Sequence, residues 1–236
     1  EDFSETKSPN TFRIFAVGGS TTFGNGVYDE ETYPYVLQKK FDSLDLGINI
    51  EVINTGLGGA WSKMEIDLIK NKLLGYDPDL FIVYDGWNDV QQEVHNKNNN
   101  EDMWKERWKE ICGLGNEKNF LTLVTLQPLV STISADKRIP PDQEYIIWDS
   151  RIYENAKISG AYEKYPAKLN ELNEHCTKTA DLRNNKSISC NAYHVANSNW
   201  YSIHNPINNI QEGGSLAHQF SSTQINTVFA GMRLHG

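Results

Sequence analysis

Short apolar runs alternate with amphipathic stretches along the first 180 or so residues of the chain. Four runs rich in β-branched and aromatic residues predict buried strands, at residues 12–17, 48–54, 80–84 and 120–126. Apolar positions three and four residues apart predict helices between and after them, at residues 33–46, 62–75, 101–111 and 162–182. Strands that are apolar on both faces are typical of parallel sheets covered by helices on each side. We therefore predict an α/β protein with a mostly parallel sheet in a three-layer α/β/α sandwich.

Two of the predicted helices carry further signals. Ser62 and Glu65 match an S-x-x-E capping box at the start of the second helix, and Gly75 is suited to end it. In the third helix, Trp104 and Trp108 are four residues apart and therefore share a face.

The length of 236 residues fits one domain with appendages. From Asn184 onward the chain becomes rich in Asn, Ser, Gln and His, with few apolar runs. We expect a polar N-terminal segment over residues 1–11, one domain over 12–199 and an atypical tail over 200–236. The tail is a divergent closing element, a frame-shifted or added sequence, or a disordered end, and the sequence leaves these three alternatives open.

The net charge of −9, with no basic cluster, argues against a nucleic-acid partner. No apolar run approaches the length of a membrane span, so we expect a soluble chain. The sequence starts with polar residues and lacks an initiator Met. If a signal peptide or anchor upstream of this start was removed, we expect the protein to lie outside the cytoplasm. The three cysteines, Cys112, Cys176 and Cys190, allow one disulfide with one thiol left over, or three unpaired thiols. The oligomeric state is left open.

In parallel α/β sheets the ligand crevice lies beyond the carboxyl ends of the strands. Gly18, Gly19 and Ser20 follow the first predicted strand. This loop lacks both the Lys-Ser/Thr pair of a nucleotide P-loop and the spacing of a dinucleotide fold, which disfavours phosphate binding. Ser20 is then a candidate nucleophile at the start of a helix, or it merely caps that helix.

The loops after the second and third strands supply candidate oxyanion donors. Gly59 offers a backbone N–H without a side chain in the way, and Asn88 offers a side-chain amide. Each has a simpler interpretation, since Gly59 is suited to a turn and Asn88 could bond its own loop. Serine, glycine and asparagine nevertheless follow strands one, two and three in that order.

Three segments resemble the first three sequence blocks of the SGNH (GDSL-type) hydrolases: Gly18 to Gly24 (GGSTTFG), Ile53 to Gly59 (INTGLGG) and Gly86 to Asp89 (GWND). The resemblance implies the flavodoxin-like fold of that family, with Ser20 as nucleophile. It also implies an oxyanion hole made by Gly59, Asn88 and the N–H of Ser20 itself. Gly19 stands where the G-D-S form of the motif has aspartate.

The family also has a D-x-x-H motif that supplies the catalytic base. His194 is the candidate base, with Asn191 in the place of the aspartate, although an ordinary polar-loop histidine is the alternative. An amide orients an imidazole but does not stabilise its charged form, and in serine proteases this change lowers kcat by about 10⁴. His95 is expected in a polar loop and His175 on a helix surface, while His204, His218 and His235 lack the preceding Asp or Asn.

The resemblance therefore implies a carboxylic ester hydrolase that forms an acyl-enzyme on Ser20, acting on short acyl esters or carbohydrate O-acetyl groups. Trp87 is a candidate substrate-binding residue beside the site, as is Tyr84, although aromatic residues near strand ends more often belong to the core. No metal-binding motif or cofactor motif is present. The alternatives are a carbohydrate O-acyltransferase that uses the same serine and a catalytically silent binding protein of the same fold.

Overall fold

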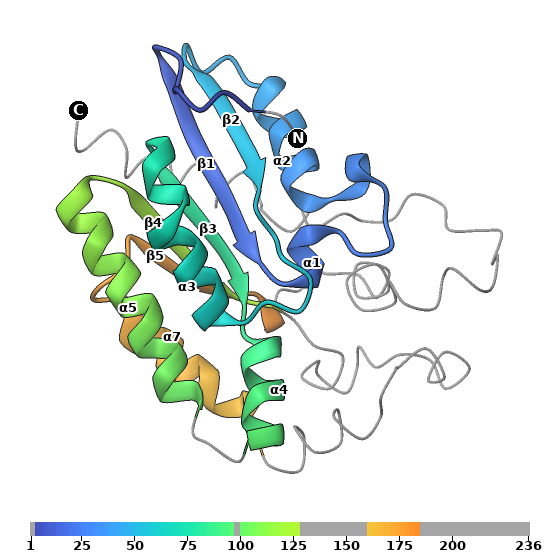
Figure 1. The fold of residues 1–236 in the computed structure, drawn as a ribbon, viewed down its shortest axis with the longest axis vertical. Coiled ribbons are helices and arrows are strands. Elements are labelled where there is room, and N and C mark those ends of the chain that lie inside the picture. The colour runs from blue at the N-terminus through green and yellow to red at the C-terminus, as the bar shows by residue number, and fades with distance from the viewer. Residues whose placement is uncertain (1–2, 97–99, 128–159, 185–236) are drawn as a thin grey trace, which may run out of the picture.

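The computed structural model describes residues 3–96, 100–127 and 160–184. Its described strands form one parallel sheet in the order β2-β1-β3-β4-β5 (Figure 1). They are β1 (Thr11–Gly18), β2 (Asn49–Asn54), β3 (Leu80–Asp85), β4 (Leu121–Leu126) and β5 (Lys178–Asp181). The first four lie where the apolar runs predicted them, so the α/β class and the parallel sheet are confirmed.

Helices cover both faces of this sheet, which confirms the three layers. The described helices are α1 (Ser20–Phe23), α2 (Tyr33–Asp42), α3 (Ser62–Asn71), α4 (Trp87–Asn96), α5 (Asn100–Lys118) and α7 (Tyr165–Leu172). In Figure 1, α3, α5 and α7 lie together on one side of the sheet, and α2 lies on the other. Alternate residues of β1 serve the two faces: Phe15 and Val17 pack toward α3, α5 and α7, and Ile14 and Ala16 toward α2.

Aromatic side chains fill the core beneath α5. Phe15 stacks on Phe81 at 5.7 Å between ring centroids, and Phe120 meets Phe81 edge-on at 5.2 Å. Trp104 and Trp108, both fully buried, belong to this same core, which explains their spacing of four residues.

The predicted helix over residues 162–182 is wrong in its second half. A 3₁₀ turn leads into α7, which ends at Leu172, and Lys178–Asp181 form strand β5 instead. This segment reads Lys-Thr-Ala-Asp and lacks the apolar run that marks a buried strand. It becomes a strand because its backbone pairs with the edge of β4, a tertiary contact that outweighs local preference.

The first residues pack onto the sheet through Arg13, which is 1% exposed. Its guanidinium donates to the carboxylate of Glu51 at 2.6 Å and to the carbonyls of Tyr76 and Ser4 at 2.7 and 2.9 Å. The ring of Phe3 lies 5.9 Å from that of Phe15. The described part of the polar N-terminal segment is therefore held against the domain body.

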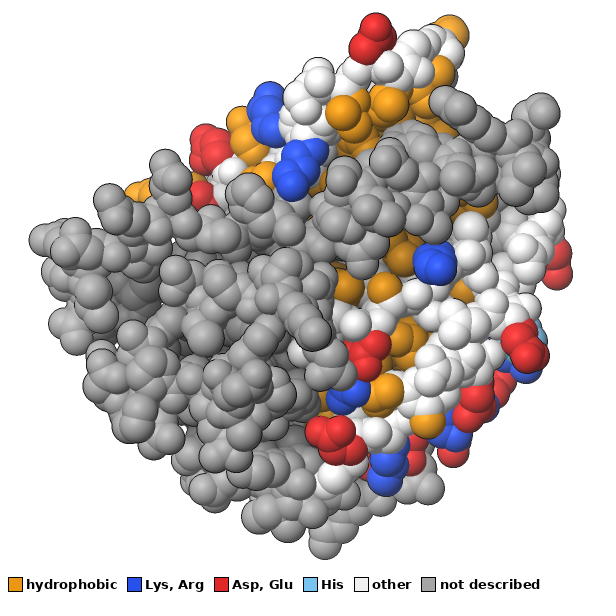
Figure 2. All heavy atoms as spheres, turned by 180° about the vertical axis from the view of Figure 1, so that it is seen from behind, with side chains coloured by type: hydrophobic (Ala, Val, Ile, Leu, Met, Phe, Trp, Pro, Cys, Tyr) orange, Lys and Arg blue, Asp and Glu red, His pale blue; other side chains and the backbone are white. Residues whose placement is uncertain are grey.

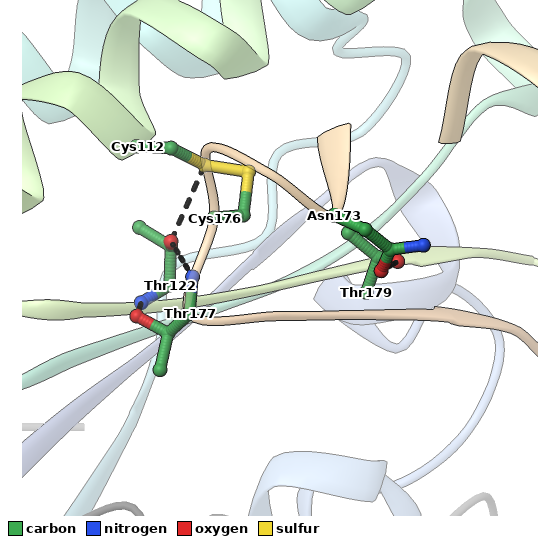
Figure 3. The surroundings of a disulfide bond; sticks show 6 residues. All are labelled: Cys112, Thr122, Asn173, Cys176, Thr177 and Thr179. Atoms are coloured by element: carbon green, nitrogen blue, oxygen red, sulfur yellow. Dashed lines mark hydrogen bonds between the residues drawn. A yellow bond between two sulfur atoms is a disulfide. The ribbon is translucent and has the colours of Figure 1, made fainter. Parts of the chain in front are cut away.

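A disulfide joins Cys112 of α5 to Cys176, just before β5, with 4.8 Å between their Cα atoms (Figure 3). Beside it, the hydroxyl of Thr122 donates to the sulfur of Cys112 at 3.2 Å. The N–H of Thr122 donates to the Thr177 hydroxyl at 3.0 Å. Of the two alternatives left open by the sequence, the structure contains the disulfide, and Cys190 lies outside the described residues.

Basic and acidic side chains are interspersed over the described surface visible in Figure 2, the face opposite that of Figure 1. Ion pairs of the same mixed kind link α5 to α7, such as Lys168 with Asp102 at 2.6 Å and Lys105 with Glu171 at 2.7 Å. Within the described ranges, no helix combines the length and apolar character needed to cross a membrane.

Candidate active site

Three loops meet at the carboxyl edge of the sheet, where β1 lies between β2 and β3. The chain passes from β1 to one neighbour and then crosses to the other, so this edge is a topological switch point, where α/β sheets open a crevice. Ser20 is the first residue of α1, which follows β1, and Asn88 is the second residue of α4, which follows β3, while Gly59 lies in the loop after β2.

Glycines allow the first two loops to approach closely. A Cβ at Gly18 would lie 2.6 Å from the carbonyl oxygen of Tyr84, and one at Gly56 would lie 2.6 Å from the carbonyl carbon of Thr22. Both contacts are with backbone atoms, which cannot move without displacing the chain. A hydrogen bond of 2.9 Å from the N–H of Leu57 to the carbonyl of Gly18 joins the same loops. A larger residue at Gly56 would therefore push these two loops apart, and one at Gly18 would collide with Thr22 and with the backbone of β3.

Ser20 is the first residue of α1, and Gly19 occupies the N-cap position without a side-chain cap. The simpler interpretation of Ser20 as a helix cap is therefore wrong. The Ser20 carbonyl accepts from the N–H groups of Gly24 and Asn25, both at 3.0 Å, while its side chain is half-buried. Because α1 has only four residues, its dipole is small, and the stabilisation of an anion here depends on individual N–H groups.

The side chain of Asn88 reaches across to both neighbouring loops. Its amide nitrogen donates to the carbonyl of Ala60, and a Cβ at Gly19 would overlap with that nitrogen. The Asn88 amide therefore bonds another loop and lies against the backbone next to Ser20. An amide nitrogen carries two hydrogens, so it can donate to an oxyanion as well as to Ala60. Gly59, directly before Ala60, has a left-handed φ of +75°, a conformation that favours glycine.

The predicted capping box at Ser62 and Glu65 is wrong. Trp61 is the N-cap of α3, and the N–H and hydroxyl of Ser62 donate to the carboxylate of Asp89, at 2.9 and 2.5 Å. Arg107 of α5 donates to the Ser62 hydroxyl at 3.0 Å and lies 3.4 Å from Asp89 Oδ1. The helix start is satisfied by a carboxylate from the first turn of α4, which local sequence spacing does not reveal.

Three buried carboxyl groups lie beneath these loops: Glu65, Asp85 and Asp89. Burial, together with the charges of the two aspartates, raises the pKa of Glu65 well above its usual range. Within the described part of the chain, neither carboxyl oxygen of Glu65 has a hydrogen-bond partner, which fits a neutral group.

The two aspartates have several donors. Burial raises the pKa of Asp85, while its carboxylate accepts from the indoles of Trp104 at 2.9 Å and Trp108 at 3.3 Å. Burial and the charge of Asp85 raise the pKa of Asp89, whereas Ser62 and Arg107 oppose that rise. This acidic group was not predicted, although an aspartate that ends an apolar strand, followed by a second aspartate four residues later, is a sequence signal for it.

The candidate base His194 and its partner Asn191 lie outside the described residues. His95 belongs to α4 and not to a loop, because the helix that begins at Trp87 runs on to Asn96. His175 follows the end of α7 instead of lying on the helix, and it adjoins Cys176. It precedes β5 and thus lies at the amino edge of the sheet, opposite Ser20.

The aromatic residues near the site differ in exposure. Tyr84 is 1% exposed and its ring lies 5.7 Å from that of Tyr33, so it belongs to the core. Trp87 is half-buried and packs against the core cluster beneath α5. Among the described residues, no group of three or more His, Cys, Asp or Glu side chains is arranged to hold a metal ion.

A parallel α/β sheet with serine, glycine and asparagine on three adjoining loops is the arrangement expected of an SGNH hydrolase. The family model described as GDSL-like Lipase/Acylhydrolase matches residues 14–222, so the chain belongs to this family. The chain is accordingly a carboxylic ester hydrolase of the SGNH type.

Solved structures share the fold at low sequence identity. AlinE4, an SGNH-hydrolase family esterase, is 17% identical with a TM-score of 0.52, covering 95% of this chain and 98% of its own. The acetyl xylan esterase AlAXEase is 18% identical with a TM-score of 0.50, covering 73% and 78%. A mutant of Axe2, an acetyl-xylooligosaccharide esterase from Geobacillus Stearmophilus, is 11% identical with a TM-score of 0.52, covering 73% and 76%. No curated protein sequence matches the chain significantly.

Proposed function

We propose that this protein hydrolyses short acyl esters, including O-acetyl groups on carbohydrates, through an acyl-enzyme on Ser20. The observation that carries the proposal is the contact between the Asn88 amide and the backbone of Gly19, directly before Ser20. An amide donor beside a half-buried serine at a switch point is suited to hold the oxyanion formed when that serine attacks a carbonyl.

In the first step, His194 accepts the proton of the Ser20 hydroxyl while Oγ bonds to the ester carbonyl carbon. The carbonyl oxygen becomes an oxyanion, and the N–H groups of Ser20 and Gly59 and the amide of Asn88 donate to it. When the intermediate collapses, the C–O bond to the alcohol breaks and His194 returns the proton to the departing oxygen. Water then attacks the acyl-enzyme by the same route and releases the acid and Ser20.

The proposed substrate class is supported by the net charge of the chain and by the kinds of esterase that share its fold. The net charge of −9 favours a neutral ester over an anionic one. The titles of AlAXEase and Axe2 describe esterases of acetylated xylan and xylooligosaccharides. Trp87, half-buried at the start of α4, is the proposed residue that contacts the acyl group or the sugar face.

The nucleophile is tested by hydrolysis of p-nitrophenyl acetate and by labelling with a fluorophosphonate probe. We expect Ser20→Ala to lower kcat by about 10³-fold or more and to abolish labelling. Ser43→Ala is the matched control, because Ser43 is exposed after α2 and its hydroxyl donates only to the carbonyl of Lys40 among the described contacts. Equal rates for Ser20→Ala and the unchanged protein would refute the proposal.

The base is tested in the same assay. We expect His194→Ala to lower kcat by about 10²- to 10⁴-fold, and Asn191→Asp to raise it because a carboxylate stabilises the imidazolium. An unchanged rate in both variants would assign the base to another residue. Adding a sugar acceptor to the unchanged protein tests acyl transfer: an acetylated sugar formed in place of free acetate would identify a transferase using the same serine.

A further inference from the structure

Asp89 connects the two loops that carry the proposed oxyanion donors Gly59 and Asn88. Its carboxylate is fully buried and accepts both the N–H and the hydroxyl of Ser62, three residues after Gly59. Asp89 itself directly follows Asn88 in the first turn of α4. One side chain thus joins the end of the loop that carries Gly59 to the first turn of α4, which carries Asn88.

Each of the three residues that follow Gly59 is held from another element. Ala60 accepts the hydrogen bond from Asn88. The guanidinium of Arg107 lies over the ring of Trp61, with 4.7 Å between the guanidinium carbon and the ring centroid. Ser62 is bound by Asp89, and Arg107 also donates to the Ser62 hydroxyl. These four contacts form one network that joins the start of α3 to α4 and α5.

Gly59 itself has little beside it. Apart from its chain neighbours, no heavy atom in the described part of the chain lies within 4 Å of the position that a Cβ would take. Its backbone direction therefore depends on the turn in which the N–H of Ala60 donates to the carbonyl of Leu57 at 3.0 Å, and on the contacts of the residues that follow. Oxyanion donors lose much of their effect when they are misplaced by about 1 Å, so whatever holds residues 60–62 also sets the geometry of the Gly59 N–H.

We propose that Asp89 is a positioning residue that sets the Gly59 N–H and the Asn88 amide relative to each other; this rests on the oxyanion role proposed for both. A carboxylate is required because both of its oxygens accept hydrogen bonds. In Asp89→Asn one oxygen becomes an NH₂ group, which cannot accept from the Ser62 hydroxyl or from Arg107. The NH₂ group can keep a bond to Ser62 only if the hydroxyl turns round and accepts, and its contact with Arg107 is lost.

A merely structural role would affect stability alone, and a second aspartate separates the two effects. Asp79 accepts a backbone N–H, that of Arg13 at 2.6 Å, and pairs with Lys7 at 2.9 Å, but it precedes β3 at the opposite edge of the sheet. Asp79→Asn is therefore a matched control: the same chemical change, with the same two kinds of partner, away from the donor loops.

The test measures kcat and KM for p-nitrophenyl acetate and the melting temperature of each variant, with activity assayed below the lowest melting temperature. We expect Asp89→Asn to lower kcat by about 10- to 100-fold and to change KM by less than about twofold. Asp79→Asn should lower the melting temperature while keeping kcat within about twofold. A kcat for Asp89→Asn that matches that of Asp79→Asn would overturn the proposal.

Ser62→Ala tests the other end of the same bond and decides the question if Asp89→Asn does not fold. It removes the bonds of the hydroxyl to Asp89 and from Arg107 and keeps the bond from the Ser62 N–H to Asp89, so we expect a smaller loss of kcat, again with KM unchanged. An unchanged kcat would count against positioning. Ser20→Ala in the same series tests the proposed function separately. Hydrolysis that depends on Ser20 but is unaffected at Asp89 and Ser62 overturns only this inference, whereas hydrolysis independent of Ser20 overturns both.

Discussion

Removing the disulfide between Cys112 and Cys176 is expected to destabilise the folded protein by about 4 kcal/mol. The bond closes a loop with a sequence separation of 64 residues. In the chain-entropy model a loop of that length restricts the unfolded chain by about 14 cal/mol/K, which gives this value at 25 °C. Both cysteines are buried, at 2% and 8% exposure, so the unlinked side chains would stay in the core and add no exposed apolar surface.

The measurement is the unfolding of the double variant Cys112→Ala/Cys176→Ala in urea and on heating. For a domain of this size, a loss of about 4 kcal/mol corresponds to a melting temperature lower by about 8–16 °C. Each alanine also removes a sulfur from the core, and the unchanged protein unfolded in the presence of reductant controls for that change, because it lacks the bond and keeps both sulfurs.

Thiol counting tests the pairing itself. The chain has three cysteines, so denatured protein without reductant should show one reactive thiol and with reductant three. The control variant Cys190→Ser should show no reactive thiol without reductant and two with reductant. Three reactive thiols without reductant, or an unfolding midpoint that reductant leaves unchanged, would refute the reasoning.

Two further substitutions test the groups beneath and beside the donor loops. The raised pKa of Glu65 means that the folded state keeps a proton that the unfolded chain releases, so stability should fall as the pH rises above the ordinary glutamate value. Glu65→Gln should therefore show a smaller loss of unfolding free energy between pH 5 and pH 8 in urea titrations, whereas parallel pH profiles would contradict the assignment. Gly19→Ala should displace the Asn88 amide and lower kcat for p-nitrophenyl acetate by about 10²-fold with little change in melting temperature; an unchanged kcat would remove Asn88 from the proposed oxyanion hole.

The sequence predicted the central strands because their residues are buried on both faces. A continuous apolar run such as Leu80 to Tyr84 can be recognised without knowledge of its neighbours in the sheet. Strand β5 is different: it lies at the edge of the described sheet, and its residues Lys178 and Asp181 give no apolar pattern. Its pairing with β4 is the only feature that identifies it, and that pairing is a tertiary contact.

The residues of the candidate site also differ in whether the sequence could predict their contacts. Ser20, Gly59 and Asn88 could be proposed from sequence because each follows a recognisable strand, and the carboxyl ends of parallel strands meet at one edge. The prediction of a capping box was wrong because Ser62 has a partner 27 residues away in the chain, in the first turn of α4, which also contains the candidate donor Asn88. A local motif specifies which bonds a residue can make, and the tertiary structure determines which of them it does make.

The disulfide and the candidate active site lie at opposite edges of this sheet. Thr122, which donates to the sulfur of Cys112, is paired with Phe81, whereas the donor loop begins after Asp85, four residues further along β3 and thus about 13 Å away. The disulfide acts mainly on the unfolded chain, so its reduction should leave the arrangement around Ser20 unchanged while the protein remains folded. Reduced protein held below its lowered melting temperature should therefore keep its kcat. A loss of activity at a temperature where the reduced protein is still folded would mean that the disulfide also supports the site.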